Sequence, residues 1–130
     1  MKLHADNPEG TNAISRHGID GVIVGGIEYT TSVLVPWQGA VQVWPVSSLA
    51  DLTDAHFAML TELRPEIVLF GSGPRIRFLA PALLRPLFDL RIGVETMDTA
   101  AACRTYNVLL AEGRSVVAAL LIEGSPLSPA

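Results

Sequence analysis

Three short apolar segments in the second half of the chain constrain the fold more than any other feature. They span residues 67–70, 92–95 and 115–122, and stretches with helical signals separate them. An uninterrupted apolar run of this length is typical of a strand covered on both faces. Strands joined through helices favour right-handed crossovers and parallel pairing. The second half of the chain therefore predicts a mainly parallel sheet.

The stretch before the strand at residues 67–70 and the stretch after it both carry signals for the start or the end of a helix. Asp51 or Thr53 can cap a helix that Pro65 ends, because a proline ring disfavours helical geometry in the residue before it. Pro81 suits the start of a second helix, since the first turn needs no backbone N–H there. Pro86 is expected to shorten or kink that helix.

The longest predicted helix lies between the second and third strands. It opens at Asp98-Thr99 and ends near Gly113. An aspartate at this position accepts hydrogen bonds from the free N–H groups of the first turn, and a glycine suits the left-handed residue that follows many helices.

The first third of the chain has the pattern of antiparallel strands. Residues 22–24 and 27–30 flank Gly25-Gly26. A two-glycine turn permits the positive φ angles that a tight hairpin requires. Further strands are expected on both sides of a second turn at 36–39. We therefore expect an antiparallel β layer ahead of the crossover units.

The chain length favours one domain with a core that needs no disulfide bonds, because 130 residues bury enough surface on folding. Hydrophobic residues make up 49% and charged residues 17% of the chain, which excludes a disordered or fibrous protein. Residues 1–12 are expected to be a flexible lead-in, 13–122 a single α/β domain, and 123–130 a flexible tail rich in proline and serine.

Charge and hydropathy restrict the partners and the location. The net charge of −4 argues against a nucleic-acid partner, because binding to phosphates requires a broad basic surface. The first residues lack the apolar core of a signal peptide. The longest apolar run, 116–122, is far shorter than the ~20 residues of a membrane helix. We expect a cytoplasmic protein without membrane insertion.

Residues 93–114 carry the most specific pattern and read GVETMDTAAACRTYNVLLAEGR. Together with Gly71-Ser72-Gly73, Phe78 and Pro81, this stretch resembles the signature of a small family of domains of unknown function. The family includes bacterial and archaeal proteins of unassigned activity, mitochondrial complex I assembly factor three and the adipogenesis-associated relative. The resemblance covers roughly residues 13–122. It implies a three-layer β/β/α domain: a central mixed sheet, a small antiparallel layer on one side and helices on one face. It implies no reaction.

The Gly71-Ser72-Gly73 turn is the main candidate for a ligand site. It lacks the third glycine of a dinucleotide fingerprint and the flanking glycines of a nucleophile elbow. In open α/β sheets, however, loops at the carboxyl ends of adjacent parallel strands form the usual ligand crevice. Weak binding of a small anion is therefore predicted there, against the alternative of a tight turn with solvated arginines. The residues concerned are Gly71, Ser72, Gly73, Arg75, Glu95, Asp98 and Thr99, with Arg77 beside them.

The long helix offers a thiol and a second candidate surface. Cys103 shares a helical stripe with Tyr106, and such a stripe favours a buried structural thiol over a nucleophile. Arg104 and Asn107 fall on another face. They are either part of a partner surface or a tie between the helix and a neighbouring loop through Glu95.

Metal and cofactor sites are not predicted. The chain has one cysteine, and its three histidines show no paired ligand spacing. The first functional hypothesis is a non-catalytic binding module that assists the assembly of a protein complex. The alternative is a small-molecule or anion-binding enzyme or regulator that uses the Gly71-Ser72-Gly73 crevice. The sequence leaves catalysis uncertain and favours its absence.

Overall fold

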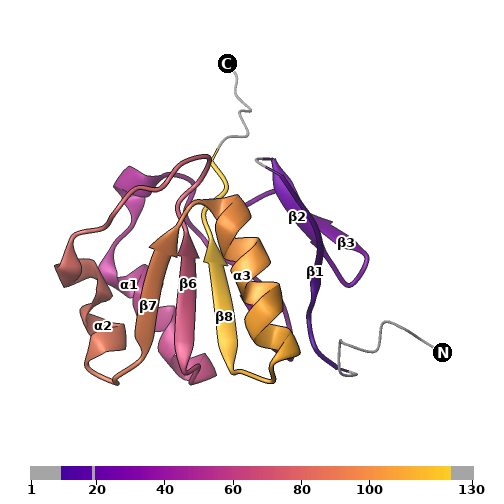
Figure 1. The fold of residues 1–130 in the computed structure, drawn as a ribbon. Coiled ribbons are helices and arrows are strands. Elements are labelled where there is room, and N and C mark those ends of the chain that lie inside the picture. Colours follow the sequence, from indigo (N-terminus) through magenta and orange to yellow (C-terminus); the bar gives the residue numbers. More distant parts are fainter. Residues whose placement is uncertain (1–9, 19, 124–130) are drawn as a thin grey trace, which may run out of the picture.

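The computed structural model describes residues 10–18 and 20–123. These residues form two sheets (Figure 1): a five-stranded sheet in the order β5-β4-β8-β6-β7 and a three-stranded antiparallel sheet in the order β1-β2-β3. The five-stranded sheet comprises β4 (Val33–Pro36), β5 (Gln42–Val43), β6 (Ile67–Gly71), β7 (Gly93–Met97) and β8 (Val116–Leu120). The small sheet comprises β1 (Ile14–Gly18), β2 (Gly21–Val24) and β3 (Ile27–Tyr29). The predicted class, a mixed central sheet with a small antiparallel layer and helices, is confirmed.

Short helices and one long helix connect the strands. Thr53 caps α1 through a reciprocal capping box with His56, as the sequence predicted for one of its two candidate caps. Asp98 accepts the backbone N–H of Ala101 at 2.8 Å and begins the long helix. The helical elements are η1 (Leu49–Asp51), α1 (Asp54–Ala58), η2 (Met59–Leu63), η3 (Pro81–Leu84), α2 (Arg85–Phe88) and α3 (Thr99–Ala111).

The second predicted helix is divided in two at its second proline. Pro81 lies in the first turn of η3, and Pro86 lies in the first turn of α2. Proline has no backbone N–H and would interrupt the hydrogen bonds inside a helix. Because a new helix begins at Arg85, Pro86 lies in a first turn, where backbone N–H groups have no intrahelical partners in any case.

The sequence assigned the first third of the chain to one antiparallel layer, and this is wrong for β4 and β5. Only the hairpin region, β1 to β3, forms the small sheet. Strand β4 pairs antiparallel with β8 in the main sheet. All four residues of β4 are buried, so this strand is covered on both faces. The main sheet provides that cover, whereas an outer three-stranded layer does not.

The helices divide between the two faces of the main sheet, whereas the predicted arrangement placed them on one. Strands β6, β7 and β8 are mutually parallel. The chain moves outward from β6 to β7 and then back across β6 to β8. Because both crossovers are right-handed, a reversal of direction puts α2 on one face and α3 on the other. Helix α3 therefore shares its face with the small sheet (Figure 1).

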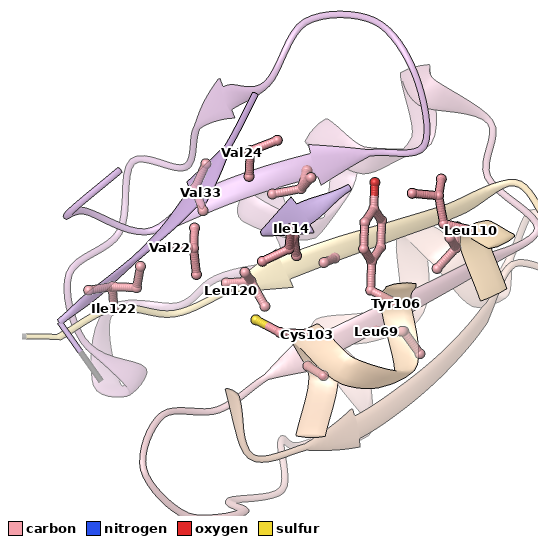
Figure 2. Close-up of a cluster of buried hydrophobic side chains, with 14 residues drawn as sticks. Ile14, Val22, Val24, Val33, Leu69, Cys103, Tyr106, Leu110, Leu120 and Ile122 are labelled. Carbon is pink, nitrogen blue, oxygen red and sulfur yellow. The ribbon is translucent and has the colours of Figure 1, made fainter. Parts of the chain in front are cut away.

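Two hydrophobic clusters cover the two faces of the main sheet. One contains Leu34, Phe70 and Leu121 and packs under α1 and α2 with Trp44. The other lies between the main sheet, α3 and the small sheet; Figure 2 shows Cys103 and Tyr106 pointing from α3 into it. Successive residues of β6 alternate between the clusters, so the apolar run of the sequence reflects burial on both sides.

Candidate functional site

The carboxyl ends of three parallel strands lie side by side. Gly71 at the end of β6 is in register with Met97 of β7 and with Leu120 of β8. The segments that follow these residues, 72–80, 98–99 and 121–123, therefore emerge at one edge of the sheet. The sequence predicted a shared edge for loops over residues 71–77 and 95–99; the parallel register confirms the shared edge, but residues 95–97 belong to β7.

The Gly71-Ser72-Gly73 turn is bonded directly to the start of α3. The Gly73 N–H donates to Thr99 Oγ1 at 2.8 Å, and the Thr99 N–H donates to the Gly73 carbonyl at 2.9 Å. The Ser72 N–H donates to the Met97 carbonyl at 2.9 Å. These bonds use the backbone donors of Ser72 and Gly73 that the sequence had assigned to an anion.

Gly71 is required for the close approach of α3. A Cβ atom there would lie 2.9 Å from Leu120 Cδ2 and 3.1 Å from Thr99 Cα. Both distances are shorter than ordinary carbon contacts, and the second involves backbone that cannot rotate away. The glycine therefore serves helix packing at this edge of the sheet.

Ser72 and Arg77 fix the shape of the loop after β6. The buried Ser72 hydroxyl donates to the Arg75 carbonyl at 2.8 Å and accepts the Arg77 N–H at 2.9 Å. The Arg77 guanidinium donates to the Ser72 carbonyl through Nε at 3.0 Å and through Nη2 at 2.6 Å. Gly73 has a φ of +106°, and a Cβ on it would lie 2.9 Å from Arg77 Nη2. Glycine is therefore needed at position 73 as well.

Glu123 completes this network from the end of the domain. Its Oε1 atom pairs with Arg77 Nη2 at 2.7 Å, and its Oε2 atom accepts the Leu49 N–H at 3.0 Å. Burial alone would raise the pKa of Glu123, but the hydrogen bonds from Arg77 and Leu49 and the charge of Arg77 outweigh it, so that pKa lies below its usual range. The carboxylate is thus ionised at neutral pH.

Two hollows lie beside this network. The first has a volume of about 130 Å³ and is lined by Asp20, Gly73, Pro74, Thr99, Leu121 and Glu123. The second is an open depression of about 320 Å³, lined by Pro74, Arg75, Arg77 and Glu123. Pro74 and Glu123 line both. We call the first hollow the edge cavity and the second the arginine depression.

The sequence missed both acidic residues that line these hollows, Asp20 and Glu123. Asp20 lies in the turn between β1 and β2, far from the crossover units in sequence, and Glu123 was placed in the predicted tail. Only the packing of the small sheet on the face of α3 brings the Asp20 turn to this edge. An acidic residue directly after the last strand was the one available signal for Glu123.

The other predicted ligand-binding residues lie around the edge rather than in the cavity wall. Asp98 is occupied as the cap of α3. Glu95 is exposed on the outer strand β7 and is not among the residues that line either hollow. Arg75 is exposed at the arginine depression. Anion binding by this group stays a prediction.

Asn107 and Arg104 differ in their surroundings. The Asn107 side chain accepts the Ile14 N–H at 2.9 Å and donates to the Ile14 carbonyl at 2.8 Å. It therefore ties α3 to β1, while Arg104 is exposed. The Tyr106 hydroxyl supports the same junction, lying 2.8 Å from the Asn12 carbonyl and 2.9 Å from the Pro36 carbonyl. A partner role for Arg104 and Asn107 stays a prediction.

The ends of the predicted domain also carry contacts. Asn12, within the predicted lead-in, donates through Nδ2 to the Pro36 carbonyl at 2.9 Å and to the Gly39 carbonyl at 2.8 Å. The remainder of the predicted lead-in up to residue 9 and the predicted tail from residue 124 lie outside the described residues.

Cys103 is fully buried, as its helical stripe predicted. Burial raises the pKa of its thiol to about 12, and the opposing effect of the Arg104 charge is smaller. A thiol in this state forms little thiolate at neutral pH, so it is a poor nucleophile. Within residues 10–18 and 20–123, His, Cys, Asp and Glu side chains form no group that could hold a metal ion. In the same part of the chain, no helix has the length and apolar character needed to cross a membrane.

A family model described as "Protein of unknown function (DUF498/DUF598)" matches residues 14–121. The chain belongs to this family. The match spans β1 to the end of β8 and therefore includes both sheets, α3 and every residue that lines the edge cavity except Glu123.

Family members with curated names include an assembly factor. The chain is 40% identical over 102 residues to NADH dehydrogenase (ubiquinone) 1 alpha subcomplex assembly factor 3 of Bos taurus. The match covers 77% of this chain and 54% of the bovine protein. The chain thus spans about half the length of that relative.

Solved structures of the family share the fold. A Bordetella parapertussis protein superposes with a TM-score of 0.83 at 38% identity, covering 89% of this chain and 99% of that one. A Bordetella pertussis protein described as an Mth938-like domain gives a TM-score of 0.83 at 34% identity, covering 98% of this chain and 96% of that one. The architecture of this chain is therefore that of the family.

Proposed function

We propose that this protein is a non-catalytic binding module that assists the assembly of a multi-subunit complex of the NADH dehydrogenase type, and that it docks through the loop over residues 74–80. The assembly role rests on the likeness to the bovine assembly factor. The docking surface rests on one structural observation: Phe78 is 75% exposed on a loop whose backbone is held by Ser72 and Arg77.

The exposure of Phe78 costs free energy that a partner can recover. An aromatic ring left in water loses the stabilisation of about 1.5–3 kcal/mol that burial provides. Ile76, two residues away, is also 46% exposed. Aromatic anchors that enter a partner's pocket supply much of the binding energy of protein interfaces.

The loop is preorganised, which reduces the entropy lost on docking. The hydrogen bonds from Arg77 to Ser72 and the ion pair between Arg77 and Glu123 anchor its backbone on the sheet edge. A loop that is already ordered loses less conformational freedom when a partner binds. Arg75 is exposed beside Ile76, so the best-fitting partner surface has an apolar pocket with an acidic rim.

A photo-crosslinking residue in place of Phe78, in the full chain expressed in its own host, tests the proposal. We expect this position to crosslink to a subunit of the NADH dehydrogenase complex. The matched control is the same substitution at Val108, which is 57% exposed on the outer side of α3. Phe78→Ala is expected to reduce the amount of assembled complex on a native gel, and Val108→Ala to leave it unchanged.

Two results would overturn the proposal. One is the same crosslinked products from positions 78 and 108. The other is normal complex assembly with Phe78→Ala, provided that the melting temperature of the variant matches that of the natural chain. Because the Phe78 side chain is 75% exposed, we expect the two melting temperatures to match, so a loss of assembly would not reflect unfolding.

A further inference from the structure

We propose that the edge cavity and the arginine depression together bind a small zwitterion of the amino-acid type, with its ammonium group in the cavity and its carboxylate in the depression. This site is separate from the exposed faces of Phe78 and Ile76. It shares Pro74, Arg75 and Arg77 with the docking loop, but its test requires only a small molecule and no protein partner, so the two proposals can fail separately.

The edge cavity is lined by acceptors. Asp20, Glu123 and Thr99 are among the residues that line it, and their side chains carry two carboxylates and one hydroxyl. Three of its backbone donors are used: the Gly73 N–H donates to Thr99 Oγ1, the Thr99 N–H to the Gly73 carbonyl, and the Leu121 N–H to the Gly71 carbonyl. A cation with several N–H groups therefore fits this wall better than an anion does.

Both carboxylates retain capacity to accept hydrogen bonds. Asp20 makes no hydrogen bond or ion pair with any residue in the described part of the chain. Each oxygen of Glu123 accepts from one donor, Arg77 or Leu49, and a carboxylate has about four lone-pair positions in all. An ammonium group can thus bond to both residues without breaking the Arg77–Glu123 pair.

The arginine depression supplies the opposite charge. The Arg75 guanidinium has no ion pair or hydrogen bond within residues 10–18 and 20–123. Arg77 uses Nε and Nη2 for its contacts, which leaves the N–H groups of Nη1 available. A planar guanidinium fork is well suited to a carboxylate.

Because the two hollows lie side by side, they favour a ligand that carries a positive and a negative charge in one molecule. Pro74 and Glu123 line both, so the two hollows are adjacent. A simple anion in the arginine depression would lie beside the Glu123 carboxylate, and a simple cation in the edge cavity would leave the Arg75 guanidinium without an ion pair. A molecule with both charges satisfies each side, and the 130 Å³ of the cavity limits the buried part to a few non-hydrogen atoms.

Glycine titrated into the full ¹⁵N-labelled chain tests the site. We expect saturable shifts of the backbone amides of Gly73, Thr99 and Glu123, with a dissociation constant on the order of millimolar. Acetate and methylammonium, titrated separately, are expected to bind at least ~10-fold more weakly, since each satisfies only one half of the site.

Variants locate the two halves. Asp20→Asn and Arg75→Gln are each expected to weaken glycine binding about 10-fold, because each removes one charge and keeps a similar shape. The control is Glu28→Gln, an exposed acid on β3 that lines neither hollow. The absence of saturable shifts, acetate binding as tight as glycine binding, or an Asp20→Asn variant that binds glycine normally would each overturn the proposal.

Discussion

The side chain of Asn107 makes two hydrogen bonds with the backbone of Ile14: it accepts the N–H at 2.9 Å and donates to the carbonyl at 2.8 Å. One side-chain amide thus binds both backbone polar groups of Ile14, a residue that also lies in register with Val24 of β2. The contact joins residues 93 positions apart in sequence and fixes the small sheet on α3.

Replacing this amide should destabilise the domain. Asn107→Leu leaves the N–H and carbonyl of Ile14 unpaired in a half-buried position, so the free energy of unfolding should fall by about 2 kcal/mol. Urea denaturation measures the loss, and faster hydrogen exchange of the Ile14 amide locates it. Val108→Ala on the exposed side of the same helix should change stability by less than about 0.5 kcal/mol. Equal stability of the two variants would contradict the structural role.

The close approach of α3 to β6 predicts a large effect from one methyl group. Gly71→Ala places a Cβ 2.9 Å from Leu120 Cδ2 and 3.1 Å from Thr99 Cα, and should cost about 1–3 kcal/mol of stability. Gly18→Ala is the matched control, because a Cβ there meets nothing within 4 Å. Thermal unfolding compares the two. A Gly71→Ala variant as stable as the control would mean that α3 can shift at no cost.

The burial of Cys103 predicts an inert thiol. With its pKa raised to about 12, the thiol should react with an aromatic disulfide at pH 8 at least ~100-fold more slowly in the folded chain than in urea. Ala111→Cys, exposed on the same helix, provides an accessible thiol and should react rapidly as a single additional equivalent. Rapid labelling of Cys103 in the native protein would reopen a nucleophilic role.

The lowered pKa of Glu123 predicts an acid-sensitive sheet edge. The folded-state pKa of Glu123 lies below the ordinary value of 4.5, so the unfolded chain binds the proton more readily. The stabilisation is therefore fully present above about pH 4.5 and is lost as pH falls through the folded pKa. Glu66, whose pKa is lowered mainly by its hydrogen bond from Arg114, acts in the same direction from the surface.

The Glu123→Gln variant tests this dependence. Its stability at neutral pH should be lower than that of the natural chain, and the difference should shrink as the pH falls below about 4.5. Glu62→Gln is the control, because the Glu62 carboxylate is exposed and makes no hydrogen bond or ion pair among the described residues. The stability of this variant should change with pH as that of the natural chain does. Denaturation at a series of pH values measures both. A constant difference across that range would contradict the role of the carboxylate.

Local signals identified most elements of the fold. The Gly25-Gly26 hairpin, the strand after Pro65 and the helix from Asp98 all lie where the sequence placed them, because turns, caps and apolar runs depend on near neighbours. The sequence also predicted that the loops after β6 and β7 share an edge, since a right-handed crossover makes the two strands parallel. Local patterns failed for β4, whose membership of the main sheet depends on pairing with β8 at the other end of the chain.

The sequence by itself determined the strands, the caps of the helices, the burial of Cys103 and the family to which the chain belongs. Tertiary structure alone decided which face α3 covers, that Asn107 reaches Ile14, and that Asp20 and Glu123 line one cavity with Thr99. The physical reason is the distance along the sequence over which each interaction acts. Caps and periodicity act over a few residues, whereas side chains from distant segments meet only after the sheet order and the packing of the small sheet have brought them to the same edge.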